Sequence, residues 1–276
     1  MYPGAYVKQN PSKAAFIMAS TGEEVSYQVF DERSNQLAHY LRYEGLKKHD
    51  HYSVFMENNN RYLESNSAGE RAGLYCTCIN SYLKTQELSY ILINSDTQIL
   101  ITSKAKLDIV KEAAKNCSLL KRILVVGADN DELPKSFLDY KKAVSDFPTT
   151  PIEDESLGTS MLYSSGTTGR PKGILRPLPD QRPDEPLPIM NFLYTLWNYR
   201  EDMIYLSPAP LYHSAPLFAN NFAIRAGATT IIMEKFDPLE FLRLIEKYAV
   251  TDSQMVPTMF NRILKLSDEE RHKYDL

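Results

Sequence analysis

Short apolar runs alternate with longer amphipathic stretches over most of the chain. Residues 98–102 and 122–126 are rich in Ile, Leu and Val, which is typical of buried strands. Between them, residues 104–116 place their apolar side chains at helical spacing. Strands that alternate with helices of this length favour a parallel sheet with helices on its faces. We therefore predict an α/β fold.

The same pattern predicts the other elements. Further strands are expected at residues 15–18, 25–27, 52–56, 75–79, 203–206, 229–233 and 251–256. Further helices are expected at residues 28–43, 61–74, 85–92, 135–144, 189–199, 216–226, 239–248 and 258–266. Residues 147–157 are rich in Pro, Thr, Asp and Glu, and we interpret them as a surface connector. Five prolines between residues 177 and 188 exclude a helix and predict an exposed, mobile excursion.

One stretch carries the residue types that bind phosphate. Residues 163–173 read Tyr-Ser-Ser-Gly-Thr-Thr-Gly-Arg-Pro-Lys-Gly and lie between two short apolar runs. Glycines allow successive backbone N–H groups to face one concavity, hydroxyls add donors, and lysine adds a compact positive charge. We predict a phosphate loop with these candidate binding residues: Ser164, Ser165, Gly166, Thr167, Thr168, Gly169 and Lys172.

Two common phosphate loops do not fit this stretch. A Walker loop places Ser or Thr after its lysine and opens a helix, whereas here Gly173 follows Lys172 and the next residues are strand-like. The dinucleotide fingerprint Gly-x-Gly-x-x-Gly is absent from the sequence. The remaining alternative is a Ser/Gly-rich β-turn that contains a lysine by chance.

A second candidate site surrounds His213. Residues 207–217 contain three prolines and this one histidine, and they lie between a predicted strand and a predicted helix. Open α/β sheets bind ligands at that position, so His213 is a candidate site residue. The alternative is a structural histidine that caps the following helix or stacks in the core.

Composition narrows the class of protein. Lys and Arg number 31 against 35 Asp and Glu, so the formal charge is −4 without a long basic run, and nucleic-acid binding is not favoured. The cysteines Cys76, Cys78 and Cys117 form no CxxC pair, which favours reduced thiols in a cytoplasmic protein over a zinc site. No secretory signal is visible, and no apolar run reaches the roughly 18 to 20 residues of a membrane span. Peripheral membrane contact stays open.

Residues 163–173 resemble the signature loop of the adenylate-forming, or AMP-binding, superfamily. This superfamily includes acyl-CoA synthetases, peptide-synthetase adenylation domains and luciferases. Several other stretches are similar to acyl-CoA synthetases that act on fatty or other hydrophobic acids: residues 71–75, 79–83, 210–213, 231–238 and 253–259. The resemblance implies the large N-terminal domain of an adenylate-forming enzyme, built from parallel-sheet α/β subdomains.

The resemblance also implies a reaction. A carboxylate attacks the α-phosphate of ATP in the presence of Mg²⁺, and the thiol of coenzyme A then displaces AMP. Lys172 would neutralise phosphate charge, Thr168 would contact the metal, and His213 would orient the acid or gate its pocket. The implied partners are a carboxylic acid, most typically a fatty acid, with ATP and coenzyme A.

Some segments that are typical of this family are missing from the sequence. The family's Tyr-Gly-x-Thr-Glu and Thr-Gly-Asp segments and its small C-terminal domain are not found here. We expect residues 1–155 to form a first α/β part and residues 156–276 a second, incomplete part. Such an amino-terminal portion would be inactive alone and could self-associate as a homodimer. Two alternatives remain, namely a short non-catalytic nucleotide- or acyl-binding module and an amino-acid-activating or luciferase-like enzyme.

Overall fold

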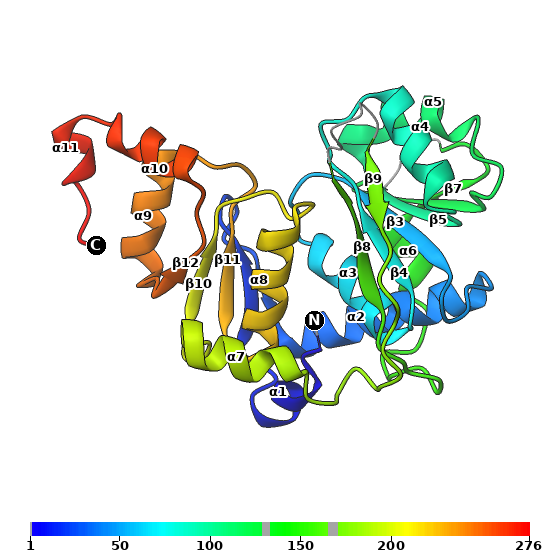
Figure 1. The fold of residues 1–276 in the computed structure, drawn as a ribbon, viewed down its shortest axis with the longest axis horizontal. Helices are drawn as coiled ribbons and strands as arrows, with labels where there is room; N and C mark the ends of the chain where they lie inside the picture. Colours follow the sequence, from blue (N-terminus) through cyan, green and yellow to red (C-terminus); the bar gives the residue numbers. More distant parts are fainter. Residues whose placement is uncertain (1, 129–132, 165–170) are drawn as a thin grey trace.

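Two sheets form the framework of the protein. The computed structural model describes residues 2–128, 133–164 and 171–276, and among these the strands are ordered β7-β6-β5-β3-β4-β8-β9 in a larger sheet and β12-β10-β11-β1-β2 in a smaller one (Figure 1). The strands of the larger sheet are β3 (His51–Phe55), β4 (Tyr75–Cys78), β5 (Ile99–Ser103), β6 (Arg122–Val126), β7 (Phe137–Asp139), β8 (Thr159–Ser164) and β9 (Lys172–Ile174). Those of the smaller sheet are β1 (Ala14–Met18), β2 (Glu24–Ser26), β10 (Ile204–Ser207), β11 (Thr229–Ile232) and β12 (Asp252–Ser253).

Helices cover the faces of both sheets. They are α1 (Gly4–Gln9), α2 (Tyr27–Tyr43), α3 (Tyr62–Arg71), α4 (Thr85–Asn94), α5 (Leu107–Ala114), α6 (Tyr140–Val144), α7 (Pro188–Trp197), α8 (Ser214–Arg225), α9 (Pro238–Tyr248), α10 (Pro257–Leu264) and α11 (Asp268–Arg271), with a 3₁₀ turn at Lys104–Lys106. Buried apolar residues of α2, α3 and α8 form one core with strands of both sheets, so these helices lie between the sheets (Figure 1). The outer face of the larger sheet packs on α4 and α5, and that of the smaller sheet on α9 and α10. None of the described helices has the length and apolarity that crossing a membrane requires.

The predicted α/β class with parallel sheets is confirmed. The pairs β3–β5, β5–β6, β4–β8 and β10–β11 are all parallel. Antiparallel pairing between described strands occurs at β1–β2 and β8–β9, where the strands are close in sequence. A short connection can reverse the chain but cannot carry it back to the start of a parallel neighbour.

The two sheets are interleaved along the chain. The early strands β1 and β2 belong to the smaller sheet with β10 to β12, whereas β8 and β9 complete the larger sheet. The expected division between residues 155 and 156 therefore does not coincide with the division into sheets. The domain boundary itself stays a prediction.

Two predicted elements differ from the structure. The helix predicted at residues 135–144 is wrong in its first half, because β7 pairs with β6 and only α6 is helical. Asp139 begins that helix by accepting a hydrogen bond from the backbone N–H of Lys142. The strand predicted at residues 251–256 is limited to β12, which pairs with β10 alone.

The proline-rich residues 176–187 contain no helix and are mostly exposed, as predicted. They are attached to the body of the protein at several points. Arg182 forms an ion pair of 3.0 Å with Glu155, and Arg225 donates a hydrogen bond of 3.0 Å to the carbonyl of Pro183. Residues 176–187 therefore form an exposed connection, held by these contacts, from β9 of the larger sheet to α7 beside the smaller sheet.

Candidate active site

The predicted phosphate loop connects the antiparallel strands β8 and β9. Ser164 is paired with Lys172 across this hairpin, and both residues are exposed. Directly opposed residues of an antiparallel pair project to the same face, so the hydroxyl and the ammonium are presented together. The predicted binding residues Ser165, Gly166, Thr167, Thr168 and Gly169 lie outside the described residues. Lys172 begins a strand rather than a helix, which confirms that this is not a Walker loop.

The opposite face of the hairpin explains one glycine. Gly173 lies across from Tyr163, on the face that side-chain alternation separates from Ser164 and Lys172. A Cβ atom at Gly173 would lie 2.5 Å from Cε of Met161 and 3.0 Å from the ring of Tyr163. The missing side chain therefore leaves room for these two neighbours to pack beneath the hairpin.

Helix α4 contacts strand β8 and the residue that precedes strand β9. The hydroxyl of Tyr163 donates a hydrogen bond of 2.7 Å to Oδ1 of Asn94, and the hydroxyl of Tyr90 donates one of 3.2 Å to the carbonyl of Pro171. Tyr90 and Asn94 are four residues apart and share one face of the helix. We call this pair of contacts the α4 clamp. Burial raises the pKa of Tyr163 to about 12, so its hydroxyl stays a donor at neutral pH.

His213 occupies the N-cap position of α8, immediately after the loop that follows β10. Its side chain makes no capping hydrogen bond and its ring is exposed, whereas its backbone carbonyl accepts the N–H of Leu217. The role of this side chain stays a prediction. The ring of Tyr212 lies 4.3 Å from the imidazole, measured between centroids. Partial desolvation lowers the pKa of His213 below its usual 6.5. The imidazole is therefore mostly neutral at pH 7 and has both a donor and an acceptor nitrogen.

Asn58 joins the carboxyl ends of the two sheets. It follows β3, and its amide nitrogen donates to the carbonyl of Ala209 at 3.1 Å and to that of Met233 at 2.8 Å. Its amide oxygen accepts from the N–H of Leu211 at 2.8 Å. The side chain is buried, with 5% of the residue exposed. We call these three hydrogen bonds the Asn58 brace.

Aromatic side chains extend the same junction toward His213. Tyr82, from the loop after β4, meets Tyr212 edge to face with 6.5 Å between ring centroids. The ammonium of Lys106 lies 5.8 Å from the centroid of the Tyr82 ring. These loops all follow the carboxyl ends of parallel strands, the edge at which open α/β sheets bind ligands. Sequence reasoning missed Asn58 and Tyr82, although a polar Glu-Asn-Asn-Asn run after a buried strand was a signal for the first.

The two predicted catalytic residues come from different sheets. Lys172 belongs to the edge hairpin of the larger sheet and His213 follows a strand of the smaller one. Among the described residues, no hydrogen bond or ion pair joins their side chains. The arrangement supplies a cation and a hydroxyl for an anionic group on one side, and a neutral imidazole with aromatic neighbours on the other.

A metal site is not apparent in the described part of the chain. No group of three or more His, Cys, Asp or Glu side chains there is arranged to hold a metal ion. The predicted metal contact, Thr168, is outside the described residues. Cys76, Cys78 and Cys117 are buried and free, in agreement with the prediction of reduced thiols.

The sequence matches known proteins over nearly its whole length. Residues 5–276 match the family described as AMP-binding enzyme. The chain is 26% identical to acyl-CoA synthetase 7 of Caenorhabditis elegans, over 98% of this chain and 51% of that protein. It is 29% identical to 4-coumarate–CoA ligase 1 of Petroselinum crispum, over 96% of this chain and 48% of that protein. The chain thus spans about half the length of these relatives.

The fold agrees with that of a solved CoA ligase. The anthranilate CoA ligase AuaEII, solved in complex with anthranoyl-AMP, superposes with a TM-score of 0.81 at 21% identity. The match covers 99% of this chain and 52% of that one. It shows that the two sheets and their helices are arranged as in that ligase.

Proposed function

We propose that this chain, which belongs to the AMP-binding enzyme family, is the amino-terminal portion of an ATP-dependent acyl-CoA synthetase. The main support is the hairpin that presents Ser164 and Lys172 side by side on an exposed face, at the ends of a loop of phosphate-binding composition. Both relatives compared above are named as CoA ligases or synthetases. The two alternative functions are therefore not favoured.

The reaction that we propose has two steps. A carboxylate oxygen bonds to the α-phosphorus of ATP while the bond from that phosphorus to the bridging oxygen of the β-phosphate breaks, giving acyl-adenylate and pyrophosphate. The thiol sulfur of coenzyme A then bonds to the acyl carbon as its proton passes to solvent, the acyl–oxygen bond breaks, and AMP leaves. The first step brings two anions together, so it depends on electrostatic neutralisation more than on covalent help.

Residue roles follow from the two sides of the site. Lys172 would neutralise charge on the leaving β- and γ-phosphates, with hydroxyls and backbone N–H groups of residues 164–169 as additional donors. His213, neutral at pH 7, would hydrogen-bond and orient the acid or gate its pocket. Thr168 would contact the Mg²⁺ that accompanies ATP.

The substrate and location belong to the same proposal. The acid would be hydrophobic, with a fatty acid as the first candidate, because the ring of Tyr212 lies against His213 and the ring of Tyr82 in turn meets Tyr212. The buried free cysteines support a reducing, cytoplasmic location.

Calorimetry with ATP on the 276-residue chain tests the proposed phosphate site. We expect binding to the wild type and a loss of about 10- to 100-fold in affinity for Lys172→Ala, since a charged hydrogen bond contributes about 1.5–3 kcal/mol. Lys265→Ala, at another exposed lysine, is the matched control and should bind ATP like the wild type. Equal affinities for all three proteins, or no binding to the wild type, would overturn the assignment of the hairpin.

A second assay tests whether this portion works alone. We expect the 276-residue chain to bind ATP but to form no acyl-CoA from ATP, a fatty acid and coenzyme A. Acyl-CoA formation by the purified chain at the rate of an intact ligase would contradict the proposal that it is a portion of the catalytic unit.

A further inference from the structure

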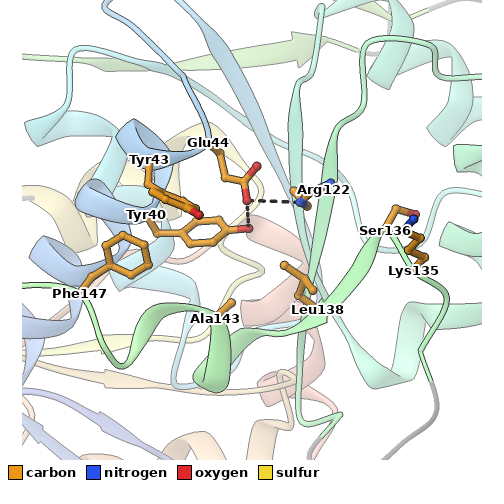
Figure 2. A pocket seen from close by; sticks show the side chains of 9 residues that line it. All are labelled: Tyr40, Tyr43, Glu44, Arg122, Lys135, Ser136, Leu138, Ala143 and Phe147. Carbon is orange, nitrogen blue, oxygen red and sulfur yellow. Dashed lines mark hydrogen bonds and ion pairs between the residues drawn. The ribbon is translucent and has the colours of Figure 1, made fainter.

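A pocket of about 660 Å³ lies beside the end of α2 (Figure 2). It opens where the end of α2 faces the first residue of β6 and the segment leading into β7. The loops of the proposed active site follow the carboxyl ends of the parallel strands, whereas Arg122 is the first residue of β6. The pocket is therefore at the opposite end of the larger sheet. Small-molecule sites have volumes of about 300–1,000 Å³, so its size suits a small organic ligand.

One end of the pocket is aromatic. The ring of Phe147 meets Tyr40 and Tyr43 edge to face, with centroid distances of 5.7 and 5.5 Å. Tyr43 is 75% exposed, which leaves part of its ring open to a ligand. Leu138 and Ala143 continue the apolar wall below these rings (Figure 2).

The other end is polar and carries an excess of positive charge. Glu44 accepts a hydrogen bond of 3.1 Å from the hydroxyl of Tyr40 and one of 3.3 Å from Nε of Arg122. The charge of Glu44 is thus balanced by Arg122, whose side chain is 43% exposed. Lys135 lines the same end and is exposed, and no ion pair with another described residue neutralises it. The lining residues therefore carry a net charge of about +1.

We propose that this pocket binds an aromatic monocarboxylate. The ring of the ligand would pack against Tyr43 and Phe147, and its carboxylate would lie between Arg122 and Lys135. Stacked or edge-to-face ring contacts favour a flat aromatic group over an aliphatic chain. A single excess positive charge matches one carboxylate, whereas a nucleotide phosphate would bring more negative charge than the pocket balances.

Titration of the 276-residue chain with trans-cinnamate, followed by ligand-observed NMR, tests this proposal. Tyr43→Ala should weaken binding by about 2- to 12-fold through the lost ring contact. Lys135→Gln should weaken it by about 1.5- to 5-fold through the lost exposed ion pair. Both positions are exposed, so neither substitution should disturb the fold. Lys141→Gln removes a neighbouring exposed charge outside the pocket and should leave binding unchanged.

Two further probes distinguish the chemistry of the ligand. Octanoate supplies the carboxylate without a ring, and AMP supplies a ring with a phosphate. The part of their binding that Tyr43→Ala removes should therefore be weaker than for cinnamate, whereas any binding at the proposed active site should persist in Tyr43→Ala. Cinnamate binding that survives both pocket substitutions, octanoate or AMP binding that is as tight as cinnamate and is lost in Tyr43→Ala, or no saturation of the wild type near about 1 mM would overturn the proposal. Because Tyr43→Ala should bind ATP like the wild type, the result is independent of the phosphate-site test.

Discussion

The Asn58 brace and the α4 clamp hold two parts of one site in different ways. The brace is buried and uses every hydrogen-bonding group of its amide to connect loops of both sheets. The clamp uses two tyrosine hydroxyls to hold a hairpin at the edge of one sheet, where Ser164 and Lys172 stay exposed. Loss of the Asn58 brace would leave buried polar groups without partners, whereas loss of the α4 clamp would free groups that water can reach. We therefore expect the brace to matter mostly for stability and the clamp mostly for ligand binding.

The largest effect is expected from Asn58→Ala. This change leaves the carbonyls of Ala209 and Met233 and the N–H of Leu211 without their partner, so the free energy of unfolding should fall by about 2–4 kcal/mol. Urea denaturation measures this loss. Asn60→Ala is the matched control, since the amide of Asn60 bonds to the carboxylate of Glu23 at the surface and should contribute less than about 1 kcal/mol. Similar losses for both variants would contradict the distinction between brace and surface contact.

Breaking the clamp should produce a smaller and different effect. Tyr90→Phe with Asn94→Ala removes both hydrogen bonds to the hairpin, and we expect a stability loss of about 1–2 kcal/mol. ATP affinity should fall about 3- to 10-fold, because the ends of the phosphate loop are no longer held at a defined spacing. Calorimetry and hydrogen exchange at the amides of β8 and β9 measure the two effects. Faster exchange with unchanged ATP affinity would show that the clamp is purely structural.

The smallest effect concerns the charge of His213. Its folded pKa is below 6.5, so between that folded pKa and 6.5 the unfolded chain binds more protons than the folded one. Its contribution to stability is therefore complete above pH 6.5 and falls as the pH drops through this window, by a small amount because the ring is exposed. NMR titration should place the midpoint of His213 below that of the same residue in urea. Tyr212→Ala should move the folded midpoint back toward 6.5, and an unchanged midpoint would contradict desolvation by Tyr212.

Residue type and local spacing predicted only those parts of the candidate site whose residues are neighbours along the chain. The glycine-rich stretch and His213 were found because their residue types stand together in sequence, and the strands on either side of the stretch are present as β8 and β9. Asn58 and Asn94 could not be assigned in this way, since their partners are 151 and 69 residues distant in the chain. The pocket beside α2 was missed for the same reason, because its walls come from three separate segments.

The sequence by itself determined the α/β class and the order of most helices and strands, because these depend on short-range contacts such as the one at the start of α9. The carboxylate of Asp237 accepts hydrogen bonds from the N–H groups of the next helix, a contact that spans three residues or fewer. Only the tertiary structure decided that β1 and β2 join β10 to β12, that Asn58 braces both sheets, and that α4 clamps the hairpin. Short-range contacts follow from neighbouring residue types, whereas strand pairing and bracing depend on which distant segments bury their apolar faces together.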